Sequence, residues 1–230
     1  MIDRNRDREQ DRDRQPPSDR EQAILADVRK FRLIEPRHIS PELRPELDRM
    51  LRQKTLYKHV VLDYKGRGRK LEVLTMPAKD GSMPRLQKPR EIYHDAAIYP
   101  AYRKAAAEIE RGGGHIETVL NDFELKSRKA RANNAAAPGR AANGPVDNRE
   151  KEAIAAKLNL TVVNGRIYLP DLQIHYRDSE NQHRVLNLEI TTDSYRGRDI
   201  APKAAAGFAM SRADGRAGAK IYDDHKGVWG

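Results

Sequence analysis

Two acidic residues, Asp171 and Glu189, are the side chains in this sequence best placed to do chemistry together. They lie in two runs rich in β-forming residues, 167–176 and 185–191, which are separated by a polar segment. This pattern predicts a β-hairpin that brings the two carboxylates close to each other. Oxygen ligands that converge on one point suit Mg²⁺, and a bound Mg²⁺ can activate water against a phosphodiester.

The same spacing also fits a plainer alternative, in which both acids are ordinary surface residues of a hairpin. The seven histidines add no candidate metal site, because no two of them have the sequence spacing that is typical of zinc ligands. His94 and His115 are therefore interpreted as packing or surface histidines. The acidic pair remains the candidate site, with Mg²⁺ as its candidate cofactor.

The composition excludes several classes of protein. The 230 residues include 44 Lys and Arg against 34 Asp and Glu, a net charge of +10, and no Cys. Without cysteine the chain has no disulfide scaffold, no Cys-ligated zinc and no thiol nucleophile. No apolar run approaches the roughly 20 residues that cross a bilayer, so we expect a cytoplasmic protein without a membrane partner. The positive charge indicates an anionic partner, and double-stranded DNA is the first candidate.

The elements that would position the acids follow from periodicity. Residues 1–20 hold six Arg against six acidic residues and almost no apolar side chain, which predicts a disordered charged tail. Residues 77–91 contain three prolines without periodicity and are interpreted as a linker. The chain thus divides into a unit over 21–76 and a larger one over 92–230.

The unit over 21–76 has apolar residues at helical spacing, then a second helix after Ser40-Pro41, then two β-rich runs at 57–64 and 70–75. This order predicts a winged helix-turn-helix, with a recognition helix for the major groove and a wing for backbone phosphates. The alternative is an accessory subdomain in which a helical hairpin packs on a β-hairpin. The expected DNA contacts are Arg49, Arg52, Lys54, Lys65, Arg67, Arg69 and Lys70.

In the unit over 92–230 we expect a helix to residue 111, a strand at 115–120 that runs on into 122–125, and a helix at 150–158. Between them, 126–149 is expected to be a long mobile basic loop. After the acidic hairpin we expect a helix over 200–211 and a strand at 219–222. The class is α/β (α+β), a mixed β-sheet flanked by helices. The loop's expected DNA contacts are Lys126, Arg128, Lys129 and Arg131.

This order of elements, with Pro-Asp at 170–171 and Glu-Ile-Thr at 189–191, resembles the PD-(D/E)xK nuclease superfamily and its restriction-endonuclease-like fold. Thr191 stands where the motif has lysine, and Lys203 on the following helix is placed to replace it. The resemblance implies that Asp171 and Glu189 bind Mg²⁺, that Lys203 stabilises charge and that Thr191 orients water. A threonine hydroxyl carries no charge and cannot supply the electrostatic part.

Adding the winged-helix pattern, His94-Asp95 and the segment 192–195, the chain resembles the replication-relaxation proteins of plasmids and other mobile elements over residues 21–222. The resemblance implies a DNA-binding protein that acts in replication initiation or DNA relaxation, with replication or mobilisation proteins as partners. Three alternatives stay open: a Mg²⁺-dependent DNA endonuclease or nickase, a catalytically inactive transcriptional or copy-number regulator, and a protein-interaction module with a solvated basic surface.

Overall fold

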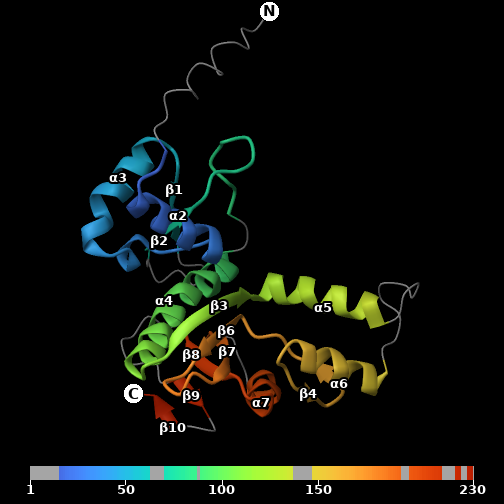
Figure 1. The fold of residues 1–230 in the computed structure, drawn as a ribbon. Coiled ribbons are helices and arrows are strands. Elements are labelled where there is room, and N and C mark those ends of the chain that lie inside the picture. Colours follow the sequence, from blue (N-terminus) through green and yellow to red (C-terminus); the bar gives the residue numbers. More distant parts are fainter. Residues whose placement is uncertain are drawn as a thin grey trace, which may run out of the picture. The chain divides into compact units, whose positions relative to one another are not determined.

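The structure is a computed structural model of the 230-residue chain (Figure 1). It describes residues 16–62, 70–86, 89–136, 147–192, 197–213, 221–223 and 227–229. The chain divides between Arg85 and Leu86 into two compact units, and this boundary falls inside the expected linker. Helices are mixed with antiparallel and parallel strands, which confirms the predicted mixed α/β class.

The first unit consists of helices followed by a β-hairpin. The two strands pair antiparallel with Tyr57 opposite Thr75 and Leu62 opposite Lys70. An isolated bridge joins Ile34 to Leu74, so a third stretch of extended chain lies beside β2. The elements are α2 (Asp19–Phe31), the 3₁₀ turns η1 (Pro36–His38) and η2 (Pro41–Leu43), α3 (Arg44–Arg52), β1 (Tyr57–Leu62) and β2 (Lys70–Thr75).

Helix α2 begins at Asp19, inside the segment that composition assigns to a disordered tail. Ser18 Oγ accepts a hydrogen bond from the Glu21 amide at 3.3 Å, and Glu21 Oε2 accepts one from the Ser18 amide at 3.0 Å. This capping box satisfies two of the amides that a helix start leaves without partners. The expected tail is therefore wrong for residues 18–20, because capping residues are as polar as a solvated tail. Residues 1–15 lie outside the described residues.

The core of this unit forms where α2 packs against both α3 and β2. An ion pair from Arg49 Nε to Glu21 Oε1, 3.0 Å long, adds a polar tie between the two helices. The apolar residues recur at helical spacing on one side of each helix, as the periodicity predicts. The buried members are Ile24, Leu25, Val28 and Phe31 of α2, Leu47 and Met50 of α3, and Leu71, Val73 and Leu74 of β2.

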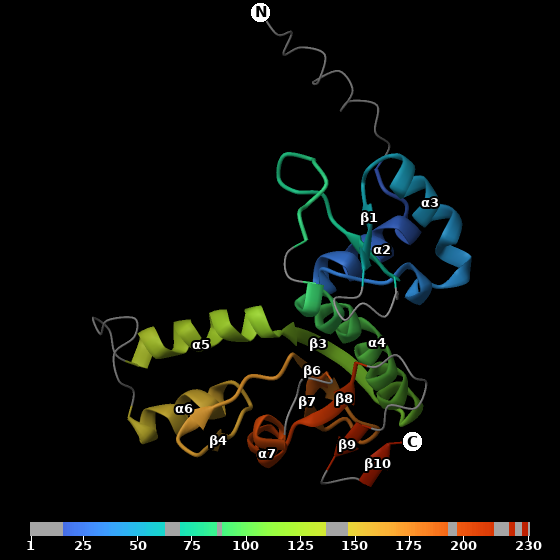
Figure 2. The same cartoon turned by 180° about the vertical axis from the view of Figure 1, so that it is seen from behind.

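The second unit is built on a six-stranded sheet in the order β10-β9-β8-β7-β6-β3, whose only parallel pair among the described strands is β7 with β8. A separate small hairpin joins β4 to β5. Helices α5 and α6 lie side by side in both views (Figures 1 and 2). The elements are α4 (Pro89–Arg111), β3 (His115–Asn121), α5 (Asp122–Ala136), α6 (Asn148–Lys157), β4 (Val162–Val163), β5 (Arg166–Ile167), β6 (Leu172–Arg177), β7 (His183–Thr191), α7 (Gly197–Ala205), β8 (Ala209–Arg212), β9 (Ile221–Asp223) and β10 (Gly227–Trp229).

Two sequence-based expectations are wrong at helix α5. The structure has a helix over Asp122–Ala136, where the sequence predicts a strand extension at 122–125 and the start of a loop at 126–149. The Glu124 carboxylate accepts a hydrogen bond from the Asn121 amide at 2.9 Å, and Asp122 and Glu124 place negative charge at the helix start. The helix has a weak apolar stripe, with Leu125 as its fully buried residue among the described ones, so periodicity does not reveal it. Residues 137–146 lie outside the described residues.

The expected helix over 200–211 is in fact a helix followed by a strand. Gly207 has φ +80°, a left-handed conformation that ends α7, and the Phe208 amide donates to the Lys203 carbonyl at 3.1 Å. Phe208 and Ala209 are buried, which draws the next residues into the sheet as β8. Strands β7 and β8 with α7 between them form a βαβ unit, the connection that a parallel strand pair needs.

The turn between α4 and β3 allows no side chain at Gly114. A Cβ built there would lie 2.6 Å from the Arg177 carbonyl oxygen and 3.0 Å from Ile109 Cγ2. At Gly112, in the same turn, a Cβ would meet its nearest atom at 3.4 Å.

We therefore expect Gly114→Ala to lower the free energy of unfolding by about 1–3 kcal/mol, because the backbone at Arg177 must move to make room. Urea unfolding of the full chain, followed by circular dichroism, measures this. Gly112→Ala is the matched control and should change the free energy by less than about 0.5 kcal/mol. Equal effects of the two substitutions would contradict the close approach.

Candidate functional site

The two acids lie opposite each other at one end of the hairpin formed by β6 and β7. The last register pair at this end joins Leu172 to Leu188, so the next step places Asp171 opposite Glu189. Glu189 is also in register with Met210 of β8, which packs against the apolar cluster of α6 and the segment after α7. The side chains of neighbouring residues in a strand point to opposite faces of the sheet, so Glu189 and Ile190 lie on different faces.

Asp171 turns its carboxylate along the sheet towards β7. Its Oδ2 accepts a hydrogen bond from the Ile190 amide at 2.7 Å and lies 3.1 Å from His94 Nε2. Strand β6 begins at Leu172, so the backbone pairing with β7 ends there. One residue earlier, the side-chain carboxylate of Asp171 accepts the hydrogen bond from the Ile190 amide of β7. Its own carbonyl accepts from the Asp122 amide at 3.1 Å, which joins the start of α5 to this point.

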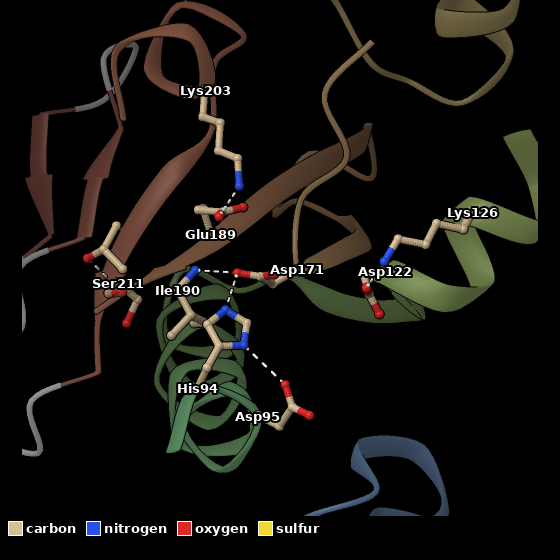
Figure 3. A network of polar contacts seen from close by, with 10 residues as sticks. His94, Asp95, Asp122, Lys126, Asp171, Glu189, Ile190, Lys203 and Ser211 are labelled. Carbon is tan, nitrogen blue, oxygen red and sulfur yellow. Dashed lines mark hydrogen bonds and ion pairs between the residues drawn. The ribbon is translucent and has the colours of Figure 1, made fainter. Parts of the chain in front are cut away.

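His94, on α4, lies between two aspartates (Figure 3). Its Nδ1 is 3.1 Å from Asp95 Oδ1, and its side chain is 22% exposed against 15% for Asp171. Burial by itself would lower the pKa of His94, but the hydrogen bonds to Asp171 and Asp95 outweigh it and raise the pKa from 6.5 to about 10. At neutral pH the ring is therefore an imidazolium, and Asp171 and His94 form an ion pair.

Sequence reasoning interpreted His94 as a packing or surface residue and missed this contact. The partners are 77 positions apart, and no local pattern connects them. The one signal in the sequence was the His94-Asp95 pair itself, because an adjacent carboxylate favours a charged ring. His115, by comparison, is exposed on β3.

Glu189 is fully buried and is paired with a cation from the helix that follows it in the chain. Lys203 Nζ donates a hydrogen bond to Glu189 Oε1, and the lysine side chain is 19% exposed (Figure 3). The strand and the helix belong to the same βαβ unit, which sets α7 against the face to which Glu189 points. Lys203 thus contacts one of the two acids, as its expected role requires.

Thr191 uses its hydroxyl within the sheet. Its Oγ1 donates to the Ser211 carbonyl at 3.3 Å, and its own carbonyl accepts from the Ala213 amide at 2.8 Å. Both bonds tie the end of β7 to β8 and the residue after it. The expected role of Thr191 in orienting water would need this hydroxyl to change its partner.

Each acid is paired with its own cation: Asp171 with His94, and Glu189 with Lys203. No three or more His, Asp or Glu side chains form a group able to hold a metal ion within the described residues. His94 lies at Asp171 Oδ2 and Lys203 at Glu189 Oε1, so a Mg²⁺ ion shared by the two acids would compete with these cations for those two oxygens.

The expected DNA-contacting cations fall into two groups. In the first unit Arg52, Lys54 and Lys70 are exposed, whereas Arg49 is engaged with Glu21. In the second unit the expected cations lie on helix α5 and not on a loop. Lys126 pairs with Asp122 at 2.6 Å, and burial lowers the pKa of Lys129. Arg128 and Arg131 are exposed, while Lys65, Arg67 and Arg69 lie outside the described residues.

No family model, no curated protein and no solved structure matches this chain. The resemblance to replication-relaxation proteins therefore rests on the short motifs alone. Within the described residues no helix has both the length and the apolar character that a membrane span requires.

Asp171→Asn keeps the size of the side chain and removes its charge. We expect the free energy of unfolding at pH 7 to fall by about 2–4 kcal/mol, because a partly buried imidazolium loses its nearest counterion. Urea unfolding measures the change. Asp122→Asn is the matched control, since its pair with Lys126 is exposed and should contribute less than about 1 kcal/mol.

The loss of stability caused by Asp171→Asn should depend on pH. The pKa of His94 is raised in the folded state, so its pairing stabilises the fold fully below pH 6.5 and this gain is lost as the pH rises through about 10. The difference between the natural chain and Asp171→Asn should therefore shrink with rising pH over this range. A difference that is constant from pH 6 to about 10 would contradict the ion pair.

Proposed function

We propose that this chain is a double-stranded DNA-binding protein of a plasmid or another mobile element, acting in replication initiation or DNA relaxation. The observation that carries the proposal is the arrangement of the first unit. A helix, an extended stretch bridged at Ile34, further helical turns and a hairpin follow one another in the order of a winged helix. In such a unit α3 enters the major groove and the hairpin contacts phosphates.

The charges of this unit support DNA as the ligand. Helix α3 buries Leu47 and Met50 and leaves Arg44 and Arg52 exposed on its other sides. The hairpin carries exposed Lys58 and Lys70 at its two strands, and the sequence between the strands adds Lys65, Arg67 and Arg69. Several cations in one small unit supply the sequence-independent part of DNA affinity.

The second unit supports a scaffold that does not cut DNA. Its two acids resemble the nuclease motif in position, yet each is held in an ion pair within the protein. A carboxylate that is paired in this way contributes to the fold, and its cation competes with a metal ion for the shared oxygen. The catalytically inactive regulator is the form of the proposal that this pairing favours.

Duplex binding is expected to weaken steeply with salt, and the four-residue variant with Lys65, Arg67, Arg69 and Lys70 all changed to Ala should reduce that dependence. Each lost phosphate contact removes about 0.9 from the slope of log affinity against log salt, so the slope should change by about 3–4. Fluorescence anisotropy of a labelled duplex at several salt concentrations measures this.

The matched control changes four exposed cations of the second unit, Arg111, Arg149, Lys157 and Arg166, to Ala. This variant should keep the slope of the natural chain within about one contact. Binding that is independent of salt, or an equal loss in both variants, would refute the assignment of DNA binding to the hairpin.

A second candidate function is a Mg²⁺-dependent DNA endonuclease or nickase. It is favoured by the contact of Lys203 with Glu189, because a lysine beside the second acid is what the nuclease resemblance implies. The ion pair of Asp171 with His94 opposes it.

Supercoiled plasmid incubated with the protein and Mg²⁺ distinguishes the two candidates. We expect binding without nicking, since both acids already have cation partners. Nicking that is lost in both Asp171→Asn and Glu189→Gln would instead establish the nuclease. Nicking that persists in both variants would come from a contaminant and would leave the acids without a catalytic role.

A further inference from the structure

Two histidines face each other on the sheet, away from the acidic pair. His175 Nδ1 lies 3.2 Å from His183 Nε2, and the ring centres are 5.3 Å apart. His175 is opposite Val185 in the register and His183 is opposite Arg177, so the two rings rise from the same face of β6 and β7. We call these two residues the histidine pair.

Gln173 fixes the proton on the first ring. Its amide nitrogen donates to the Leu158 carbonyl at 3.0 Å and to Asn187 Oδ1 at 2.8 Å, so its amide oxygen is the atom that faces His175 Nε2 at 2.9 Å. Because an amide oxygen only accepts, His175 must carry its proton on Nε2. The lone pair of a neutral His175 is then on Nδ1 and points at His183.

This is the arrangement that a metal-binding histidine needs. Histidine ligands usually donate the other ring N–H to a fixed acceptor, which sets the tautomer and the ring orientation. Two ring nitrogens at 2.0–2.1 Å from one tetrahedral ion lie about 3.3 Å from each other. The observed 3.2 Å between the nitrogens is close to that separation, so an ion can lie between them once the neutral His183 ring moves its proton from Nε2 to Nδ1.

The surroundings are open to solvent and favour one type of ion. The His183 side chain is 41% exposed, and Glu117 Oε2 lies 3.9 Å from His183 Nε2. Glu117 Oε1 is occupied by Arg177 Nε at 2.8 Å, and Arg128 also places positive charge near His175. Cations that depend on carboxylate charge, such as Mg²⁺, are disfavoured here, whereas zinc, copper and nickel ions bind neutral imidazole strongly.

We propose that the histidine pair binds one divalent transition-metal ion of the zinc and copper class. The two imidazoles are its protein ligands and water completes the coordination, because no larger group of His, Asp or Glu gathers there among the described residues. The site is separate from the proposed DNA-binding function and from the acidic pair.

Isothermal titration of the full chain with ZnCl₂ tests the proposal. We expect His183→Ala and His175→Ala each to weaken zinc binding at this site by at least tenfold, the size of loss that disturbing a metal site causes. His59→Ala is the matched control, since it removes a strand histidine of the first unit and should leave zinc binding unchanged. Circular dichroism checks that each variant folds.

A spectroscopic measurement keeps the test independent of stability. With one equivalent of Cu²⁺, electron paramagnetic resonance should show coupling to two nitrogens in the natural chain and to fewer in His183→Ala. Zinc affinity that is equal in the natural chain and in His183→Ala would overturn the proposal, as would the absence of zinc binding by the natural chain.

Discussion

One carboxylate at the end of β6 holds three parts of the second unit together. Asp171 accepts from the Ile190 amide of β7, pairs with His94 of α4 and through its carbonyl receives the first amide of α5. A carboxylate that is mostly removed from water is unfavourable unless it is hydrogen-bonded and paired. The positions of the helix, the strand and this acid are therefore mutually dependent, and the rest of the unit is arranged around that point.

The fully buried Glu189 shows the same constraint on a second acid. Its cation comes from α7, which the chain must traverse to make β8 parallel to β7. Topology thus delivers Lys203 to Glu189 without any local sequence relation between them. Both acids of the motif-like hairpin are balanced within the fold, and this balance gives them a structural role whatever chemistry they support.

The sequence predicted the elements whose burial is periodic, such as α2, α3 and β1. It failed where polar contacts or weak periodicity decide the structure: the capping box at Ser18, helix α5 with one fully buried residue, and β8 after Gly207. Of the site, Asp171 and Glu189 came from motif positions, and Lys203 came from its place on the following helix. His94 entered only as part of the His94-Asp95 pair, and its contact with Asp171 was missed because a pair 77 residues apart leaves no trace in local spacing.

Strand β3 ends the six-stranded sheet, and its pairing with β6 slips between Ile116 and Thr118. The residue at the slip is Glu117, whose charged side chain lies beside Arg177 and the histidine pair. A strand edge that is straight and apolar recruits strands from other molecules, whereas a bulged edge with a charge does not. The irregularity at Glu117, together with the charge of its side chain, thus makes this edge of the sheet a poor template for strands of other molecules.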